Sequence, residues 1–96
     1  MDLNTLLTQY RSRILELAKE CKIKEVFVFG SVARGEARED SDVDLLISLD
    51  KGASLLDVGR FKWKAEEILH RKVDIAFENK LHASISDQIM KEAQAL

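Results

Sequence analysis

The sequence predicts a small α/β (α+β) fold in which helices pack on a mixed β-sheet. Two hydrophobic patterns alternate along the 96 residues: spacings of three and four, typical of amphipathic helices, and short runs or alternations, typical of strands. The connections between the predicted strands differ in length. A short one suits a reversal of direction, whereas one that contains a long helix suits a parallel crossover. Helices must then cover at least one face of the sheet to bury its apolar side.

The first third of the chain predicts a helix and then a buried strand. Apolar side chains recur every three or four residues over residues 3–21, which gives one stripe of an amphipathic helix. Residues 26–29 form an apolar run that ends at Gly30, and their β-branched and aromatic side chains are typical of a buried strand. Residues 31–41 are small and charged, so we expect a short helix or turn followed by a loop.

The rest of the chain predicts two further strands and two further helices. Residues 43–49 alternate as a strand, with Asp44 on the face opposite to its apolar neighbours. Ser54 and Asp57 have the spacing of a capping box at the start of the next helix, and residues 73–77 alternate as a third strand. A last helix is expected near the C-terminus. Its N-terminal cap would comprise Ser84 and Asp87, and its apolar face Ile85, Ile89, Ala93 and Leu96.

The composition favours a globular domain and argues against several other classes of protein. With 46% hydrophobic and 33% charged residues, the chain is expected to form a single globular domain over residues 1–96. The net charge of -2 does not favour direct nucleic-acid binding. No apolar run approaches the roughly 20 residues of a membrane span, so no membrane partner is expected. One cysteine, Cys21, allows neither an intramolecular disulfide nor a cysteine-based zinc site, which favours a cytoplasmic setting; we expect this thiol to be buried.

Three aspartates form a candidate metal site. Asp42 and Asp44 lie two residues apart and so share one face of a strand, where they repel each other unless a cation lies between them. Ligation by oxygen alone favours magnesium, with manganese as the alternative. Asp74 has the same relative place on the third strand and converges with them if the two strands are neighbours. Three such carboxylates suit two metal ions in phosphoryl-type transfer, with Asp74 as the acceptor of the hydroxyl proton.

Gly30 and Ser31 predict the place of a phosphate group. A glycine at the end of a strand allows a phosphate to approach the backbone closely. The backbone N–H groups at the start of a following helix attract anions, and the Ser31 hydroxyl adds a donor. Arg34 either contacts the phosphates or pairs with Glu36 or Asp40. The segment is not a P-loop, because the Gly-Lys-Ser/Thr ending of that motif is missing.

Taken together, these motifs resemble the nucleotidyltransferase superfamily of DNA polymerase β type. In that pattern an apolar strand precedes Gly-Ser, an Asp-x-Asp strand follows about ten residues later, and a third carboxylate comes later still. Here Gly30-Ser31 is followed by ten residues, then by Asp42-Val43-Asp44, and later by Asp74. The segments 30–35 and 41–45 resemble the minimal nucleotidyltransferases of bacteria and archaea. An isolated Asp-x-Asp is most often a solvated strand end; its combination with Gly-Ser makes the resemblance specific.

The resemblance implies a palm-like fold and attack on the α-phosphate of ATP or another nucleoside triphosphate, with two magnesium ions. Asp42, Asp44 and Asp74 would be the catalytic and metal-binding residues, and Gly30, Ser31 and Arg34 would contact the nucleotide. Minimal nucleotidyltransferases are often encoded beside a HEPN-domain toxin. They act as its antitoxin by binding it or by adenylylating one of its tyrosines.

Three functions stay open at this point. The first is an enzyme that transfers a nucleoside monophosphate, AMP in the simplest case, to a hydroxyl group on a protein. The second is a non-catalytic antitoxin or regulatory subunit that neutralises a partner by binding, and the third is transfer to a small molecule. The small size favours a HEPN-type partner or a homo-oligomer, because a lone catalytic half would leave the reaction open to water. Three features outside the motifs are expected at the surface: a partly exposed Trp63, the two histidines His70 and His82, and a solvated helix face that contains Glu66 and Glu67.

Overall fold

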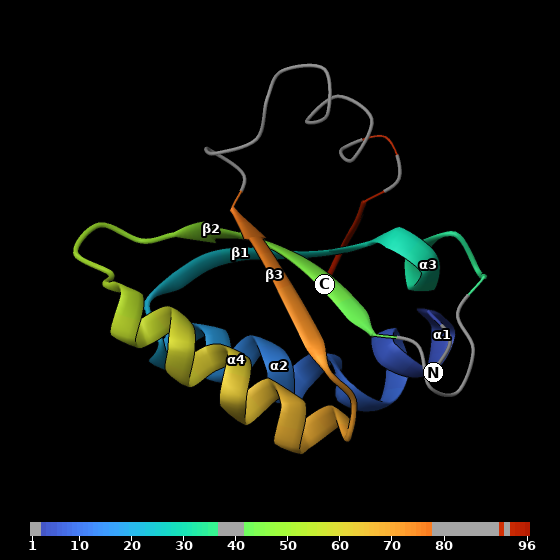
Figure 1. Ribbon diagram of the computed structural model, residues 1–96, viewed down its shortest axis with the longest axis horizontal. Coiled ribbons are helices and arrows are strands. Elements are labelled where there is room, and N and C mark those ends of the chain that lie inside the picture. The colour runs from blue at the N-terminus through green and yellow to red at the C-terminus, as the bar shows by residue number, and fades with distance from the viewer. Residues whose placement is uncertain (1–2, 37–41, 78–90, 92) are drawn as a thin grey trace.

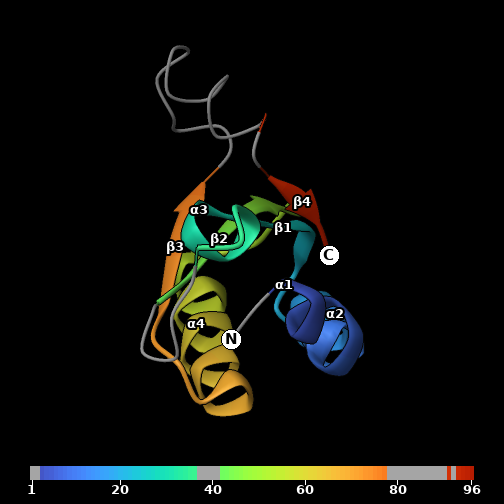
Figure 2. The same cartoon turned by 90° about the vertical axis from the view of Figure 1, so that its right-hand side faces the viewer.

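A mixed β-sheet forms the centre of the structure, and helices α2 (Arg11–Glu20) and α4 (Leu55–Leu69) both lie on one of its faces (Figures 1 and 2). This computed structural model describes residues 3–36, 42–77, 91 and 93–96, and the statements below concern that part of the chain. The other described elements are α1 (Leu3–Thr5), the π-helical turn η1 (Leu6–Tyr10), β1 (Ile23–Phe29), α3 (Gly30–Ala33), β2 (Val43–Leu49), β3 (Val73–Phe77) and β4 (Gln94–Ala95).

The predicted N-terminal helix is confirmed in extent but contains a π-helical turn that the sequence did not predict. An extra residue in such a turn rotates everything before it around the helix axis. Leu6 is accordingly fully buried, although the predicted stripe consists of Leu3, Leu7, Tyr10, Ile14, Leu17 and Cys21. The helix ends where the Cys21 N–H donates to the carbonyls of Leu17 and Ala18, at 3.0 and 3.2 Å. Cys21 itself is buried, as expected.

The sheet has the strand order β3-β2-β1-β4, which confirms the mixed sheet. The short connection through α3 returns β2 antiparallel to β1, and the long connection through α4 places β3 parallel to β2. Both directions agree with the lengths of the connections. β1 begins at Ile23, three residues before the predicted start, and an irregularity in the register lies between Ile23 and Glu25.

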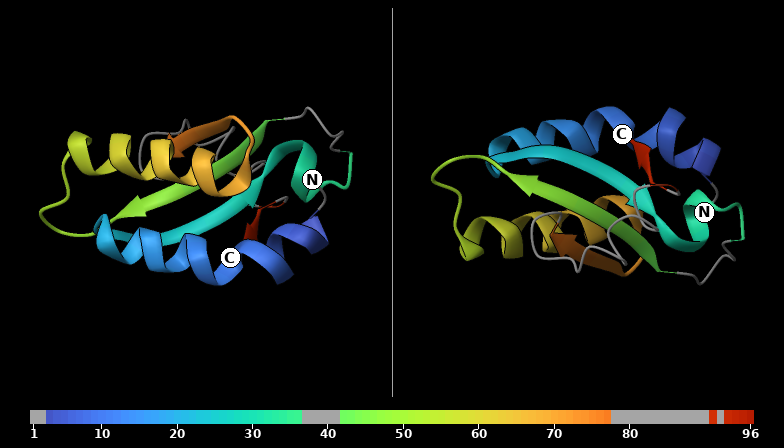
Figure 3. Two further views of the ribbon diagram at one scale, coloured as in Figure 1. Left: turned by 90° about the horizontal axis from the view of Figure 1, so that it is seen from below. Right: turned by 90° about the horizontal axis from the view of Figure 1, so that it is seen from above.

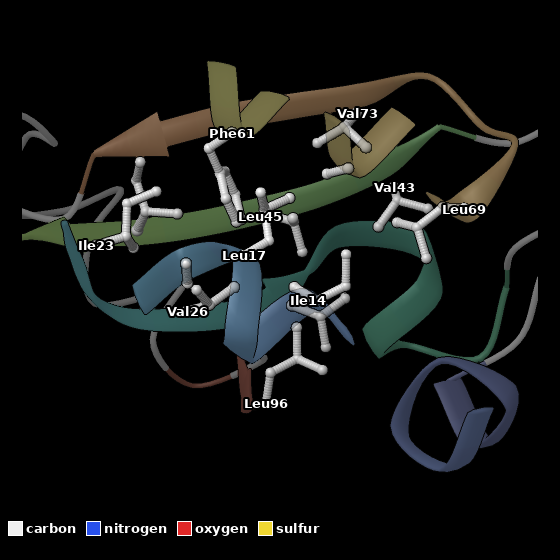
Figure 4. Close-up of a cluster of buried hydrophobic side chains, with 14 of the residues drawn as sticks. Ile14, Leu17, Ile23, Val26, Val43, Leu45, Phe61, Leu69, Val73 and Leu96 are labelled. Carbon is white, nitrogen blue, oxygen red and sulfur yellow. The ribbon is translucent and has the colours of Figure 1, made fainter. Parts of the chain in front are cut away.

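The main hydrophobic core fills the space between the sheet and the two long helices (Figure 4). Alternate residues of β2, among them Val43 and Leu45, face Phe61 of α4 and Ile14 of α2. The sheet face on the far side is crossed by no described helix, as the view from above in Figure 3 shows. The even-numbered residues of β2 point to that second face, which carries Asp44 and Ser48 together with the fully buried Leu46.

Helix α4 begins with the predicted capping box. The Ser54 N–H donates to Asp57 Oδ2 at 2.9 Å, and the Asp57 N–H donates to Ser54 Oγ at 3.4 Å. The helix ends at His70, which adopts a left-handed conformation with φ of 54° and is exposed, as expected. Trp63 is 60% exposed, which confirms its predicted place at the surface. No helix in the described ranges is long and apolar enough to cross a membrane.

The predicted last helix is wrong at its C-terminal end. Gln94 and Ala95 form β4, which pairs antiparallel with β1, and the Leu96 N–H donates to the Val26 carbonyl at 3.0 Å. Leu96 is buried in the core as predicted, but it extends from a strand rather than from a helix. The free edge of β1 offers unpaired backbone groups, and pairing with them outweighs a weak local helical pattern. Ser84, Ile85, Asp87 and Ile89 of that prediction, with His82, lie outside the described residues.

Candidate functional site

The predicted carboxylates gather where β2 and β3 begin. The parallel register places Asp44 directly beside Asp74, so the two strands are neighbours, as the sequence required. Both aspartates alternate with residues of the core, which puts their side chains on the sheet face away from α2 and α4. Asp42 comes just before β2 and is half-buried.

Gly30 lies against the carboxylate of Asp44. The antiparallel register pairs Asp44 with Phe29, and a Cβ atom at position 30 would lie 2.2 Å from Asp44 Oδ2. Gly30 also has a φ of 71°, in the left-handed region that favours glycine. The Asp44 side chain thus lies in the space that a side chain at position 30 would need, and the close approach of a phosphate to this backbone stays a prediction. Two independent constraints therefore require glycine at this position.

The turn after β1 is the short helix α3, which confirms the prediction for this segment. Buried Val32 anchors it against the core, while Ser31 is half-buried. The Arg34 N–H donates to the Gly30 carbonyl at 3.1 Å, and the Glu36 N–H donates to the Ser31 carbonyl at 2.8 Å. These bonds hold Gly30 and Ser31 in a tight turn next to Asp44.

The electrostatics of the site are unfavourable for the charge of Asp44. Burial raises the pKa of the Asp44 carboxyl, and the neighbouring carboxylates of Asp74 and Asp42 raise it further. A side-chain hydrogen bond with Asp74 acts in the same direction, and the positive charge of Arg34 acts against them. The fold therefore brings together like charges that call for an additional positive partner.

Arg34 forms the ion pair with Glu36 that was among its predicted roles, and its contact with phosphates stays a prediction. Its Nε donates to Glu36 Oε2 at 3.1 Å, and both side chains are largely exposed. The predicted pairing with Glu36 is confirmed, and Asp40 lies outside the described residues. The charge of Arg34 nevertheless reaches Asp44, so it belongs to the electrostatic surroundings of the site.

A complete metal-ligand set is not assembled in the described ranges. No group of three or more His, Cys, Asp and Glu side chains there is arranged to hold a metal ion. Asp44 and Asp74 are adjacent, but the convergence of Asp42 with both of them on one ion stays a prediction. The donor type still fits, because these three side chains offer only the oxygen ligands that magnesium and manganese prefer.

Glu66 helps to position the site, although its place in the sequence did not indicate this role. It was expected on a solvated helix face, but its Oε2 accepts the backbone N–H of Val73 at 2.9 Å and Lys62 Nζ at 3.3 Å. On the other side of the same peptide unit, the Lys72 carbonyl accepts the Val43 N–H at 2.9 Å. The first peptide of β3 is thus held by α4 and by β2 at once. This clamp fixes the start of the strand that carries Asp74.

The fold is that of a nucleotidyltransferase. A family model described as nucleotidyltransferase domain matches residues 7–96, and this chain belongs to that family. Protein MJ0435 of Methanocaldococcus jannaschii, whose name makes it a protein adenylyltransferase, is 36% identical over 91% of this chain and 94% of its own. Protein adenylyltransferase MntA of Thermococcus cleftensis is 33% identical over 95% of this chain and 89% of its own.

Solved structures agree with this assignment. A structure described as a minimal nucleotidyltransferase matches with a TM-score of 0.86 and 46% identity, over 100% of this chain and 97% of the other. A more distant match, with a TM-score of 0.64 and 15% identity, covers 88% of this chain and 66% of the other. It comes from a tri-AMPylated HEPN toxin of Shewanella oneidensis in complex with an MNT antitoxin. That likeness concerns the fold alone. The resemblance to minimal nucleotidyltransferases is thus confirmed.

Proposed function

We propose that this chain is a magnesium-dependent protein adenylyltransferase that transfers AMP from ATP to a hydroxyl group of a partner protein. The observation that carries the proposal is that Asp44 lies directly beside Asp74 and against Gly30. That contact joins the carboxylates to the turn where a triphosphate would bind. The names of the two curated relatives support AMP as the transferred group and a protein as its acceptor.

The residues of the site divide the chemistry between them. Asp42 and Asp44 would hold magnesium, whose positive charge offsets the developing charge on the triphosphate when it is bound. The backbone N–H groups of the Gly30–Ser31 turn and the Ser31 hydroxyl would bind the phosphate oxygens. Asp74 would accept the proton of the attacking hydroxyl, and Arg34 would add positive charge at the edge of the site. Attack on the α-phosphate forms the new P–O bond and releases pyrophosphate.

The acceptor in this proposal is a tyrosine of a HEPN-domain toxin, and this chain is the antitoxin of a cytoplasmic pair. The support is the similar fold in the complex of an AMPylated HEPN toxin with its MNT antitoxin. The exposed side chain of Asp74, with the half-buried side chains of Asp42 and Asp44 beside it, is accessible to a partner's hydroxyl. Modification of a surface tyrosine suits a small domain in which Asp74 is exposed.

The decisive experiment compares Asp44→Asn with Asp50→Asn. Asp50 is exposed beyond the other end of β2, so its substitution makes the same chemical change away from the site. Each protein is incubated with α-labelled ATP, magnesium and the product of the neighbouring gene. We expect Asp50→Asn to transfer label normally and Asp44→Asn to lose about a hundredfold or more, because it removes a proposed ligand.

Two results separate the proposal from its competitor. Transfer at the normal rate by a folded Asp44→Asn protein would overturn the assignment of the site. If Asp44→Asn transfers nothing but still neutralises the toxin in a growth assay, neutralisation proceeds by binding. Circular dichroism of both variants excludes unfolding as the cause of lost transfer.

A further inference from the structure

Helix α4 carries a second apolar stripe on the side that faces solvent. Leu55, Leu56 and Trp63 are 78%, 86% and 60% exposed, while the same helix buries Phe61 and Ala65 completely. Leu56 and Trp63 are seven residues apart, close to two full helical turns, so they lie on one side of the helix. Leu55 borders the same stripe, about a quarter of a turn around the helix from Trp63. Exposed apolar side chains gathered in this way mark an interaction surface.

Gly59 stands at the middle of this stripe. It is a poor helix former within a helix of 15 residues, and a Cβ atom at this position would meet nothing within 4 Å. The packing of this chain therefore gives no reason for a glycine here. A glycine on a helix surface allows another backbone to approach closely. We therefore expect the backbone that packs against Gly59 to belong to another protein chain.

We infer that α4 pairs with α4 of a second copy of this chain, antiparallel across a twofold axis at Gly59. Leu55 lies four residues before Gly59 and Trp63 four residues after it. A twofold axis at Gly59 therefore places Leu55 of each copy against Trp63 of the other, which makes the surface self-complementary. Rows of residues four apart are also the ridges that interlock in the commonest class of helix packing.

The charges beside the stripe are compatible with this pairing. On one flank Arg60 is paired with Asp57 at 3.4 Å, and on the other Lys62 is paired with Glu66 at 3.3 Å. Each copy therefore neutralises its own flanks, and two like faces meet without strong repulsion. The dimer also leaves the carboxylate site open, because α4 covers the opposite face of the sheet (Figure 2).

The sole tryptophan of the chain makes this dimer measurable. Three large side chains per copy form a small interface, so the dimer should dissociate on dilution within the micromolar range. Sedimentation velocity over a concentration series should show a monomer–dimer equilibrium. The emission of Trp63 should shift to shorter wavelength over the same range, because the indole leaves water on association.

Gly59→Ala separates the interface from the stability of the fold. Alanine favours the helix, so the Tm of the dilute monomer should rise by about 4 °C. The new methyl group should meanwhile weaken the dimer by at least about tenfold, because a single added methylene disturbs close packing. Ser12→Ala is the matched control, since Ser12 is exposed on α2, away from the stripe, and also gains helix propensity. It should leave dimerisation unchanged.

Three results would overturn the inference. One is a chain that sediments as a monomer at all concentrations, with constant Trp63 emission. Another is a dimer that Gly59→Ala does not weaken, which would place the interface elsewhere. The third is an emission shift that occurs only when a HEPN-type protein is added, which would assign the stripe to that partner. None of these results bears on label transfer, so the proposed function is tested separately.

Discussion

Replacing Gly30 with alanine tests the contact on which the proposed site depends. The substitution has two consequences that the structure separates. Alanine is forced into a left-handed conformation at a φ of 71°, and its methyl group would lie 2.2 Å from Asp44 Oδ2. Gly35 is the matched control because it has a φ of 76°, yet a Cβ atom there would meet nothing within 4 Å. Gly35→Ala therefore has the backbone strain without the clash.

The magnitudes follow from this geometry. Both variants should lose about 1–2 kcal/mol of unfolding free energy from the left-handed backbone. Gly30→Ala should lose about 1 kcal/mol more, because the displaced Asp44 side chain leaves its preferred rotamer. Removing the clash requires the carboxylate to move by about 1 Å, and a misplacement of that size costs about a hundredfold in catalysis.

Two assays decide the outcome. Urea unfolding gives the free energies of unfolding, and transfer from α-labelled ATP gives the activity at a temperature where both variants are folded. We expect Gly35→Ala to keep its activity within a few-fold and Gly30→Ala to lose about a hundredfold. Equal activity in the two variants would refute the reasoning, because the position of Asp44 would then not depend on Gly30.

Further predictions follow from other parts of the structure. Glu66→Ala should lose about 1–3 kcal/mol, because a buried backbone N–H loses its acceptor, whereas Glu66→Gln should lose less and Glu67→Ala almost nothing. The backbone N–H that binds Glu66 lowers the pKa of that carboxyl, so its stabilisation is complete above the ordinary carboxyl pKa and is lost as the pH falls through the lowered value. The unfolding free energies of wild type and Glu66→Gln should therefore converge in acid. Ser54→Ala should cost about 1 kcal/mol in urea unfolding through loss of the helix cap. In metal-free buffer, Asp44→Asn should raise the Tm, because it removes a charge whose burial and neighbours raise the pKa of this carboxyl; an unchanged or lower Tm would contradict that account. Cys21 should react with a disulfide reagent only as fast as the fold opens, because its thiol is 1% exposed.

The elements that the sequence predicted correctly are those with a long or strongly periodic pattern. The alternation over residues 43–49 determined which side chains face the core and which carry the site. The length of α4 indicated that β3 runs parallel to β2. Once that direction is known, Asp74 comes to lie beside Asp44. The positions of Asp44 and Asp74 thus follow from the alternation of apolar residues along the strands and from the lengths of the connections, both of which can be read from a single sequence.

The features that escaped prediction depend on groups that lie far apart in the chain. β4 forms because it pairs with the edge of β1 at Phe27 and Val28, and the sequence around residue 94 does not indicate that this edge is available. Glu66 has the spacing of a solvated helix face, and only the position of β3 turns it into a clamp. The contact of Gly30 with Asp44 likewise requires the antiparallel register of β1 and β2. In each case the local pattern was compatible with more than one partner.

The site itself shows that stability alone did not select its residues. An asparagine at position 44 would have a similar shape without the like-charge repulsion from Asp74 and Asp42, yet the chain has a carboxylate there. The same carboxylate requires a glycine at position 30, and glycine loses more conformational entropy on folding than other residues do. Two residues that are unfavourable for stability, Asp44 and Gly30, are therefore in contact with each other, while the opposite face of the sheet packs an entirely apolar core. Local conflicts of this kind, within a fold that is otherwise consistent, are expected where function constrains the sequence. The contact between Gly30 and Asp44 is thus the strongest structural argument that the carboxylates act in chemistry.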